Sequence, residues 1–184
     1  MFYTGESGVP FTWIYSGDIN GDNSANNDPI YIPKDAHNAS EIVFAQNGTL
    51  TPAAQADSME AFINRYPCVA AQRGQIMARN SCRFPWTHYM DVAIRQPLPT
   101  LRGQHLIFEL DAFNFLNLLN KNWGAYPSGS TNDPFILIRQ SFTGGNDLTN
   151  GAQPTFRYSP NFNLTNTQNA SSNYRLQAQL RYTF

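Results

Sequence analysis

Tyr174-Arg-Leu-Gln-Ala-Gln-Leu-Arg-Tyr-Thr-Phe184 is the stretch of sequence that decides the fold class. Its even-numbered residues are apolar or aromatic, and its odd-numbered residues are arginine, glutamine or threonine. Strict alternation with a period of two predicts a strand that has one apolar face and one polar face. Strands of soluble sandwiches are usually about five or six residues long, whereas a tilted strand that crosses a bilayer has about 9–11. The length therefore favours a membrane strand.

Five further segments have the composition of strands, so the sequence predicts an all-β chain. The six expected strands lie near residues 2–16, 86–96, 104–115, 134–142, 154–160 and 174–184. In the segment 104–115, Leu106 and Phe108 fall on one face, while Glu109 and Asp111 fall on the other. Carboxylates need water or partners, so we expect the face with Glu109 and Asp111 to line an aqueous lumen.

The composition supports amphipathic strands and argues against other classes of protein. Aromatic residues reach 14% and charged residues only 14%, and the formal net charge is −1. No basic patch stands out, so we expect no nucleic-acid partner. No apolar run approaches the roughly 20 residues of a membrane helix, which leaves strands as the only means of crossing a bilayer.

These segments predict an antiparallel transmembrane β-barrel segment in which short connections lie on the periplasmic side and long ones outside. The connection 97–103 is then an inner turn, and residues 17–85 form a long outer loop. A sheet in lipid has to close, and single-chain barrels begin at about eight strands. Six strands therefore need more chain or more copies. Residues 1–6 lack the features of a signal peptide, so we expect a fragment, the C-terminal part of a larger barrel.

The outer loop is expected to contain a short helix at residues 51–64. Thr51 suits the N-cap, and Pro52 suits the first helical position. Close behind the helix come Cys68 and Cys82, for which a disulfide and two free thiols are the alternatives. We favour the disulfide, because an exported loop experiences an oxidising compartment.

One acidic stretch resembles half a calcium-binding loop. Asp18, Asn20, Asp22 and Asp28 offer oxygen ligands, which suit a hard cation. Gly21 does not occupy the position that glycine takes in such loops, and Pro29 stands where a bidentate glutamate is expected. The alternative is a polar outer loop rich in turn formers.

The remaining polar residues point to no catalytic chemistry. The three histidines, His37, His88 and His105, lack the spacing of metal ligands, and we expect them at surfaces or interfaces. Asp91, like the lumen carboxylates, is expected to pair with arginine. The sequence shows no nucleophile motif and no phosphate-binding loop, so we do not expect an enzyme.

Several motifs, taken together and in order, resemble TonB-dependent receptors, particularly the Oar-like group. The strongest are Trp86-Thr-His-Tyr-Met-Asp91 and Glu109-Leu-Asp-Ala-Phe-Asn-Phe-Leu-Asn-Leu-Leu-Asn120. Weaker motifs are Ser7-Gly-Val-Pro-Phe-Thr12, Gly17-Asp-Ile-Asn-Gly-Asp22, Asn27-Asp-Pro-Ile-Tyr-Ile-Pro33, Arg79-Asn-Ser81 with Pro85-Trp86, and the ending Leu180-Arg-Tyr-Thr-Phe184. In order, these motifs cover most of the chain.

The resemblance implies a plugged barrel of about 22 strands in the bacterial outer membrane. Such receptors take up scarce ligands with energy from the TonB complex, which they contact through an N-terminal part that this sequence lacks. The partners implied are outer-membrane lipid, the rest of the barrel and its plug, and the barrel-assembly machinery. Tyr182 and Phe184 match the family's terminal assembly signal.

Two other functions fit the same alternating segments. One alternative is a structural outer-membrane or surface protein that contributes strands to an oligomer. The other is a secreted β-domain that binds carbohydrate through exposed aromatic side chains. Dependence on detergent separates both barrel hypotheses from the secreted domain.

Overall fold

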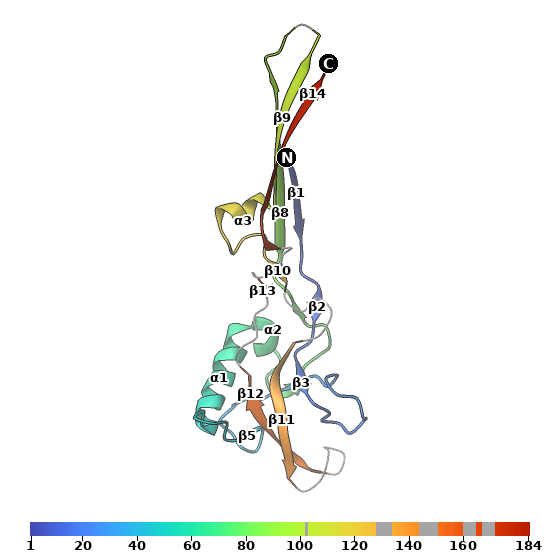
Figure 1. Ribbon diagram of the computed structural model, residues 1–184. Helices are drawn as coiled ribbons and strands as arrows, with labels where there is room; N and C mark the ends of the chain where they lie inside the picture. The colour runs from blue at the N-terminus through green and yellow to red at the C-terminus, as the bar shows by residue number, and fades with distance from the viewer. Residues whose placement is uncertain (102, 128–133, 144–150, 160–164, 167–171) are drawn as a thin grey trace. The chain divides into compact units, whose positions relative to one another are not determined.

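The computed structural model describes residues 1–101, 103–127, 134–143, 151–159, 165–166 and 172–184 (Figure 1). Within these residues the chain is mostly strand with few helices, and most strand pairs are antiparallel. The chain forms two compact units. The first comprises Met1–Gly8, Phe84–Ser128 and Asn163–Phe184, and the second comprises Val9–Arg83 and Gly129–Phe162. Among the described residues, no helix has the length and hydrophobicity that a membrane span requires.

The first unit is built on a sheet of four antiparallel strands, in the order β1, β8, β9, β14 (Figure 1). Their bounds are β1 Phe2–Glu6, β8 Thr87–Leu98, β9 His105–Phe113 and β14 Arg175–Thr183. The unit also contains the short helix α3, Phe115–Leu119, and a small ladder between β10, Tyr126–Pro127, and β13, Thr165–Asn166. The strands expected near 86–96, 104–115 and 174–184 thus lie side by side.

The short connection of this sheet lies at one of its ends, and the two long connections lie at the other. At one end, the turn 99–104 joins β8 to β9, and β14 finishes with Thr183 opposite His105. At the other end, Glu6 pairs with Thr87 and Phe113 pairs with Arg175. Both long connections, from β1 to β8 and from β9 to β14, leave the sheet at this second end, and together they supply the whole second unit.

The second unit contains a mixed sheet in the order β3, β11, β12, β5. Its strands are β3 Ile14–Ser16, β11 Phe135–Thr143, β12 Gln153–Tyr158 and β5 Val43–Phe44. The central pair β11 and β12 is antiparallel, and each outer strand runs parallel to its neighbour. Two smaller ladders pair β2, Pro10–Phe11, with β7, Cys82–Arg83, and β4, Tyr31–Ile32, with β6, Gln75–Ile76.

Helix α1, Pro52–Arg65, packs on this sheet and is followed by the short helix α2, Pro67–Ala70. The Oγ1 of Thr51 accepts a hydrogen bond from the Ala54 N–H, so the expected N-cap is confirmed. The buried side of the helix includes Met59 and Ile63. Such caps contribute about 1 kcal/mol, but the apolar side contributes more, because each buried side chain of this size adds about 1.5–3 kcal/mol.

A buried glutamine ties α1 to the sheet. Gln55 is fully buried, and its Oε1 accepts a hydrogen bond from the backbone N–H of Tyr158 at 2.9 Å. Its Nε2 donates to the carbonyl of Ala45 at 2.7 Å. Beside it, the Trp13 ring meets the edge of Phe62 with centroids 4.9 Å apart and planes at 89°. The unit therefore has a packed aromatic core, and the buried amide of Gln55 is hydrogen-bonded on both of its polar atoms.

A disulfide and an ion pair hold the segments that follow α1. Cys68 in α2 is joined to Cys82 in β7, with 5.4 Å between their Cα atoms. The guanidinium of Arg73 donates to both carboxylate oxygens of Glu60, at 2.6 and 3.1 Å. This pairing lowers the pKa of Glu60. The expected outer loop 17–85 is therefore mostly a folded unit with its own core, of which the predicted helix is only one part.

Two of the six expected strands belong to this second unit, which corrects their assignment as neighbouring barrel strands. The expected segments 134–142 and 154–160 overlap β11 and β12, and residue 160 lies outside the described residues. Leu137 is fully buried and Phe156 is 4% exposed, because these strands face a protein core. The segment expected as one strand near 2–16 is divided into β1, β2 and β3, and only β1 joins the four-stranded sheet. Alternation identifies a strand but does not identify its sheet.

One surface contact in the second unit gives a pH-dependent prediction. The Nδ1 of His37 lies 3.1 Å from the Oδ1 of Asp35, and its Nε2 lies 2.8 Å from the Oδ1 of Asp57 in α1. A neutral imidazole has a single N–H, so donating to both carboxylates requires the protonated ring. The two hydrogen bonds, Asp57 first, raise the pKa of His37.

We therefore expect the His37 contacts to stabilise the unit fully below about pH 6.5, the pKa of free histidine, and to be lost as the pH rises through the higher folded value. A titration of the His37 ring followed by NMR should give a pKa above about 6.5. The Asp57→Asn variant should lower that pKa, whereas Asp18→Asn, a matched change away from the ring, should not. An unchanged pKa in Asp57→Asn would contradict the pairing.

Candidate functional site

The two faces of the four-stranded sheet are the first candidate for function. Residues that pair across strands share a face, and the register aligns Leu176 with Ala112 and Val92, and Leu180 with Phe108. The apolar face defined in this way runs across β8, β9 and β14. Its members are His88, Met90, Val92, Ile94, Gln96, Leu98, Leu106, Phe108, Leu110, Ala112, Leu176, Ala178, Leu180 and Tyr182. His88 and Gln96 are polar members of this set, and Tyr182 carries a hydroxyl group.

Nothing in the described part of the chain buries this apolar face. No residue of β1, β8, β9 or β14 is buried, and every residue of β14 is exposed. Leu180 is 62% exposed and Leu176 is 56% exposed. Soluble proteins rarely leave contiguous apolar surface of more than a few hundred Å² open to water. The face therefore has the character of a surface that contacts an apolar partner.

The opposite face of the sheet is polar and carries ion pairs. The Nε of Arg95 donates to Glu109 Oε1 at 2.7 Å, and these two residues are direct partners in the β8–β9 register. The guanidinium of Arg175 lies over the ring of Phe113, 5.3 Å from its centroid. Glu109 was expected to pair with arginine, and the structure provides that pair. A sheet with one apolar and one charged face needs different surroundings on its two sides.

The aspartate and the first asparagine of the receptor-like motifs meet where β9 ends. Asn114 adopts a left-handed conformation with φ 51°, and its N–H donates to the Oδ1 of Asp91 at 2.8 Å. Its buried side-chain amide donates to the carbonyls of Gly124 and Ser172, both at 3.0 Å. A Cβ at Gly124, where φ is +61°, would lie 2.0 Å from the Asn114 Oδ1. Only glycine fits there, so this contact fixes the loop after α3.

The second asparagine of the motif shapes the same loop. The Nδ2 of Asn117 donates to the carbonyls of Lys121 and Trp123, both at 3.0 Å. Its Oδ1 accepts a hydrogen bond from the backbone N–H of Tyr174, just before β14. These bonds join α3, its loop and the start of β14, and they hold Trp123 in place.

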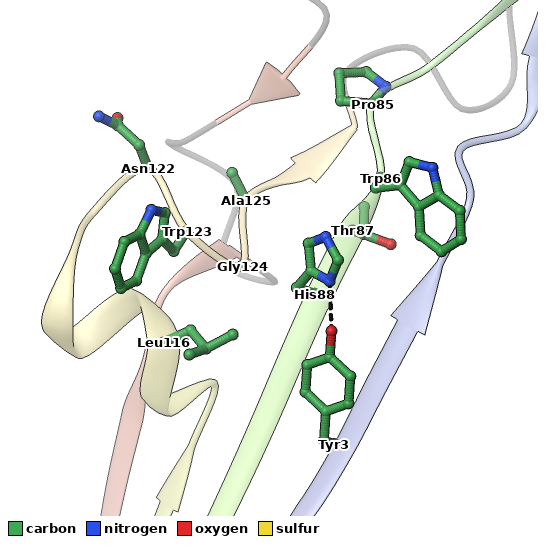
Figure 2. A pocket seen from close by; sticks show the side chains of 10 residues that line it. All are labelled: Tyr3, Pro85, Trp86, Thr87, His88, Leu116, Asn122, Trp123, Gly124 and Ala125. Carbon is green, nitrogen blue, oxygen red and sulfur yellow. Dashed lines mark hydrogen bonds between the residues drawn. The ribbon is translucent and has the colours of Figure 1, made fainter.

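A cavity of about 400 Å³ lies between this loop and the adjoining ends of β1 and β8 (Figure 2). The loop contributes Leu116 and the residues from Asn122 to Ala125, and the strands contribute Tyr3 and the residues from Pro85 to His88. The Oη of Tyr3 lies 2.7 Å from the Nδ1 of His88. His88 was expected only at a surface or an interface, and the sequence offered no signal that the distant Trp86 and Trp123 would line one cavity.

The predicted calcium residues form a hydrogen-bonded loop in the second unit. Asp28 is 7% exposed, and its Oδ2 accepts hydrogen bonds from the N–H groups of Ile19 and Asn20 at 2.8 and 3.3 Å. Asp18 accepts from two further backbone N–H groups, and Asp22 from one backbone and two side-chain groups. The three hydrogen bonds that Asp22 accepts lower its pKa, and the bond from the side chain of Asn27 contributes most.

No group of three or more acidic, histidine or cysteine side chains converges as a metal site in the residues that the structure describes. The oxygens of Asp18, Asn20, Asp22 and Asp28 serve the loop's own N–H groups. Calcium binding at these four residues stays a prediction. The loop geometry itself is explained without an ion, because Asp and Asn side chains commonly satisfy backbone donors in turns.

The expected assembly signal lies at the end of the sheet that carries the short turn. Tyr182 is 50% exposed on the apolar face and pairs with Leu106. Phe184 follows β14, is 94% exposed, and has its ring centroid 6.1 Å from that of Tyr182. Both rings are accessible, as a recognition signal requires.

Comparison of the chain with family models, with curated proteins and with solved structures found no match. Function is therefore inferred from the two faces of the sheet, the cavity and the resemblance of the motifs.

The acidic loop provides a test of whether its carboxylates stabilise the fold in the absence of calcium. In the presence of a chelator, Asp28→Ala should lower the free energy of unfolding by about 1–3 kcal/mol, because it leaves two N–H groups without their acceptor. Asp22→Ala, an exposed change in the same loop, should cost less. Chemical denaturation measures both. Equal losses in the two variants would contradict the special role of Asp28.

Proposed function

We propose that this chain forms part of the barrel wall and the outer connections of a TonB-dependent receptor in the bacterial outer membrane. The observation that carries the proposal is the apolar face, which is continuous across three strands in register and uncovered. A bilayer is the surrounding that suits it, because lipid covers one face of a barrel strand while water or a plug meets the other. The ion pair between Arg95 and Glu109 lies on the opposite face, which suits that aqueous lumen.

The distribution of connections supports the same proposal. Outer-membrane barrels have short turns on the periplasmic side and long loops outside. In this chain the turn 99–104 lies at the end of the sheet where β14 finishes, and both long connections leave from the other end. In the proposed orientation, Phe184 lies on the periplasmic side, and the second unit is an extracellular domain made from the two outer connections.

The described strands leave two edges open, β1 and β14. An open edge in hydrocarbon leaves backbone groups without hydrogen bonds, so the proposal requires further strands to close the sheet. In the receptor these would belong to the rest of the barrel, and a plug would fill the lumen. Uptake of a scarce ligand would be energised by the TonB complex acting on that plug. The barrel-assembly machinery would be a further partner, through Tyr182 and Phe184.

A secreted β-domain is supported less well. Such a domain covers the apolar face of its sheet with a second layer, and the described residues place no buried side chain on any of the four strands. An oligomer that pools strands from several copies would share the apolar face and the open edges. It is therefore an outcome of the tests below.

The face assignment predicts opposite results for neighbouring substitutions in β14. Leu180→Arg should impair insertion into lipid vesicles, because an arginine facing lipid costs about 2–4 kcal/mol near the middle of the bilayer. Gln179→Arg should be tolerated, because that side chain lies on the polar face beside Glu109. Insertion is measured as the fraction of protein that resists extraction and protease.

Equal damage from the two arginines would end the membrane proposal, as would a wild-type chain that stays soluble and monomeric without detergent. Assembly of full barrels from several copies of this chain alone would favour the oligomer over the receptor. Cross-linking in detergent and in vesicles distinguishes these outcomes.

Deleting Phe184 should reduce the yield of assembled protein in cells, with little change in the stability of protein that has folded. The side chain is 94% exposed, so few native contacts are lost. Leu101→Ser is the control, because Leu101 is 77% exposed in the turn 99–104. Assembly yield is measured from outer-membrane fractions, and stability by denaturation in detergent. An unchanged yield would remove Phe184 from the assembly signal.

A further inference from the structure

Three aromatic rings with nearly parallel planes lie close together at the end of the sheet where the long connections begin. The ring of His88 is 6.1 Å from the ring of Trp86, with planes at 12°, and 6.1 Å from the ring of Tyr3, with planes at 18°. Figure 2 shows these rings side by side with their faces turned in the same direction. The rings of Tyr3, His88 and Trp86, whose planes are nearly parallel, therefore form an aromatic platform.

A hydrogen bond between two of the rings and a glycine beside them determine the geometry of this platform. The Tyr3 hydroxyl and the His88 imidazole are 2.7 Å apart, which fixes the two rings relative to each other. Gly5 is the direct partner of His88 in the β1–β8 register. A Cβ at Gly5 would lie 3.1 Å from the Tyr3 Oη and 3.5 Å from the His88 Nδ1. Because Gly5 has no side chain, the hydroxyl group of Tyr3 has space to reach the imidazole of His88.

The platform forms one wall of the 400 Å³ cavity, and the loop after α3 forms the other. Trp123 on that loop is 51% exposed, and Trp86 on the platform is 63% exposed. The hydrogen bonds of Asn114 and Asn117 fix the loop. Pockets for small ligands typically have volumes of about 300–1,000 Å³ and rigid, largely apolar walls with a few polar groups. This cavity meets each of those conditions.

The side chains that line the cavity determine which kind of ligand can bind there. Among the described residues, the lining contains no aspartate, glutamate, lysine or arginine, so these residues offer a charged ligand no permanent countercharge. Its polar groups are the Thr87 hydroxyl, the Asn122 amide and the Tyr3–His88 pair, which can exchange hydrogen bonds with hydroxyl groups. A suitable ligand is a neutral ring with an apolar face for stacking and hydroxyl groups around its rim.

A pyranose of the glucose type has this form, because its equatorial hydroxyls leave axial C–H groups on both faces of the ring. These C–H groups carry slight positive charge and pack on the negative face of an aromatic ring. We propose that the cavity binds the pyranose ring of a neutral, glucose-type saccharide, stacked on Trp86 and His88. The sugar has two possible sources, a free oligosaccharide or the head of a glycolipid. The cavity defines the site whether or not the sheet is embedded in a membrane.

The test uses the full chain in dodecyl amine oxide, a detergent without sugar, and isothermal calorimetry. Two probes are titrated, the free β-linked glucose disaccharide and dodecyl β-glucoside. Saturable binding of the free disaccharide supports a site for oligosaccharides. Binding of the glucoside alone supports a site for a glycolipid head. No heat of binding with either probe, or a glucoside signal that further amine oxide reproduces, would overturn the proposal.

Variants locate the binding. Trp86→Ala should weaken the affinity about tenfold, because one stacked aromatic ring is lost. Phe135→Ala is the matched control, because Phe135 is an exposed aromatic residue in β11 of the second unit and does not line the cavity. Gly5→Ala keeps every ring and crowds Tyr3, so it should also weaken binding while circular dichroism shows an unchanged fold. Equal affinities of the Trp86→Ala, Gly5→Ala and Phe135→Ala variants for the saccharide would rule out this cavity.

Discussion

The pairing register of β8, β9 and β14 is the constraint on which the rest of this structure depends. Backbone hydrogen bonds align the strands so that apolar residues such as Leu180 and Phe108 share one face, and charged residues such as Glu109 share the other. A slip by one residue would reverse every side chain of a strand and destroy both faces at once. The β9 end is also fixed by the contact of Asn114 with Asp91, which ties the cavity loop to the same register.

The sequence was most informative where alternation is long and unbroken. Residues Arg175–Thr183 of the expected segment 174–184 form β14, and its two faces are those that the alternation predicts. The helix with Thr51 as its N-cap was also predictable, because a capping residue, a proline at the first position and an apolar stripe are local signals. The pairing of Cys68 with Cys82 in the structure agrees with the expectation for an exported chain.

Local sequence patterns did not predict the contacts between segments that lie far apart in the sequence. The β11 segment has strand character, but its partner β3 lies far away in the sequence, so nothing local assigned it to the second unit. The aromatic platform was missed for the same reason, since Tyr3 and His88 are brought together only by the β1–β8 pairing. Gly5 and Gly124 are ordinary in the sequence, and only the structure shows that each leaves space for a neighbouring side chain.

The order in which the second unit takes its strands from the chain has a consequence for biosynthesis. During translation β3 is made early, but β11, beside which it lies, emerges only after most of the chain. The four-stranded sheet is completed later still, by β14. Neither unit can complete its sheet until its last strand has been made, so the nascent chain exposes apolar strands until that point. Chaperones that bind unfolded segments would therefore govern its yield before any native contact does.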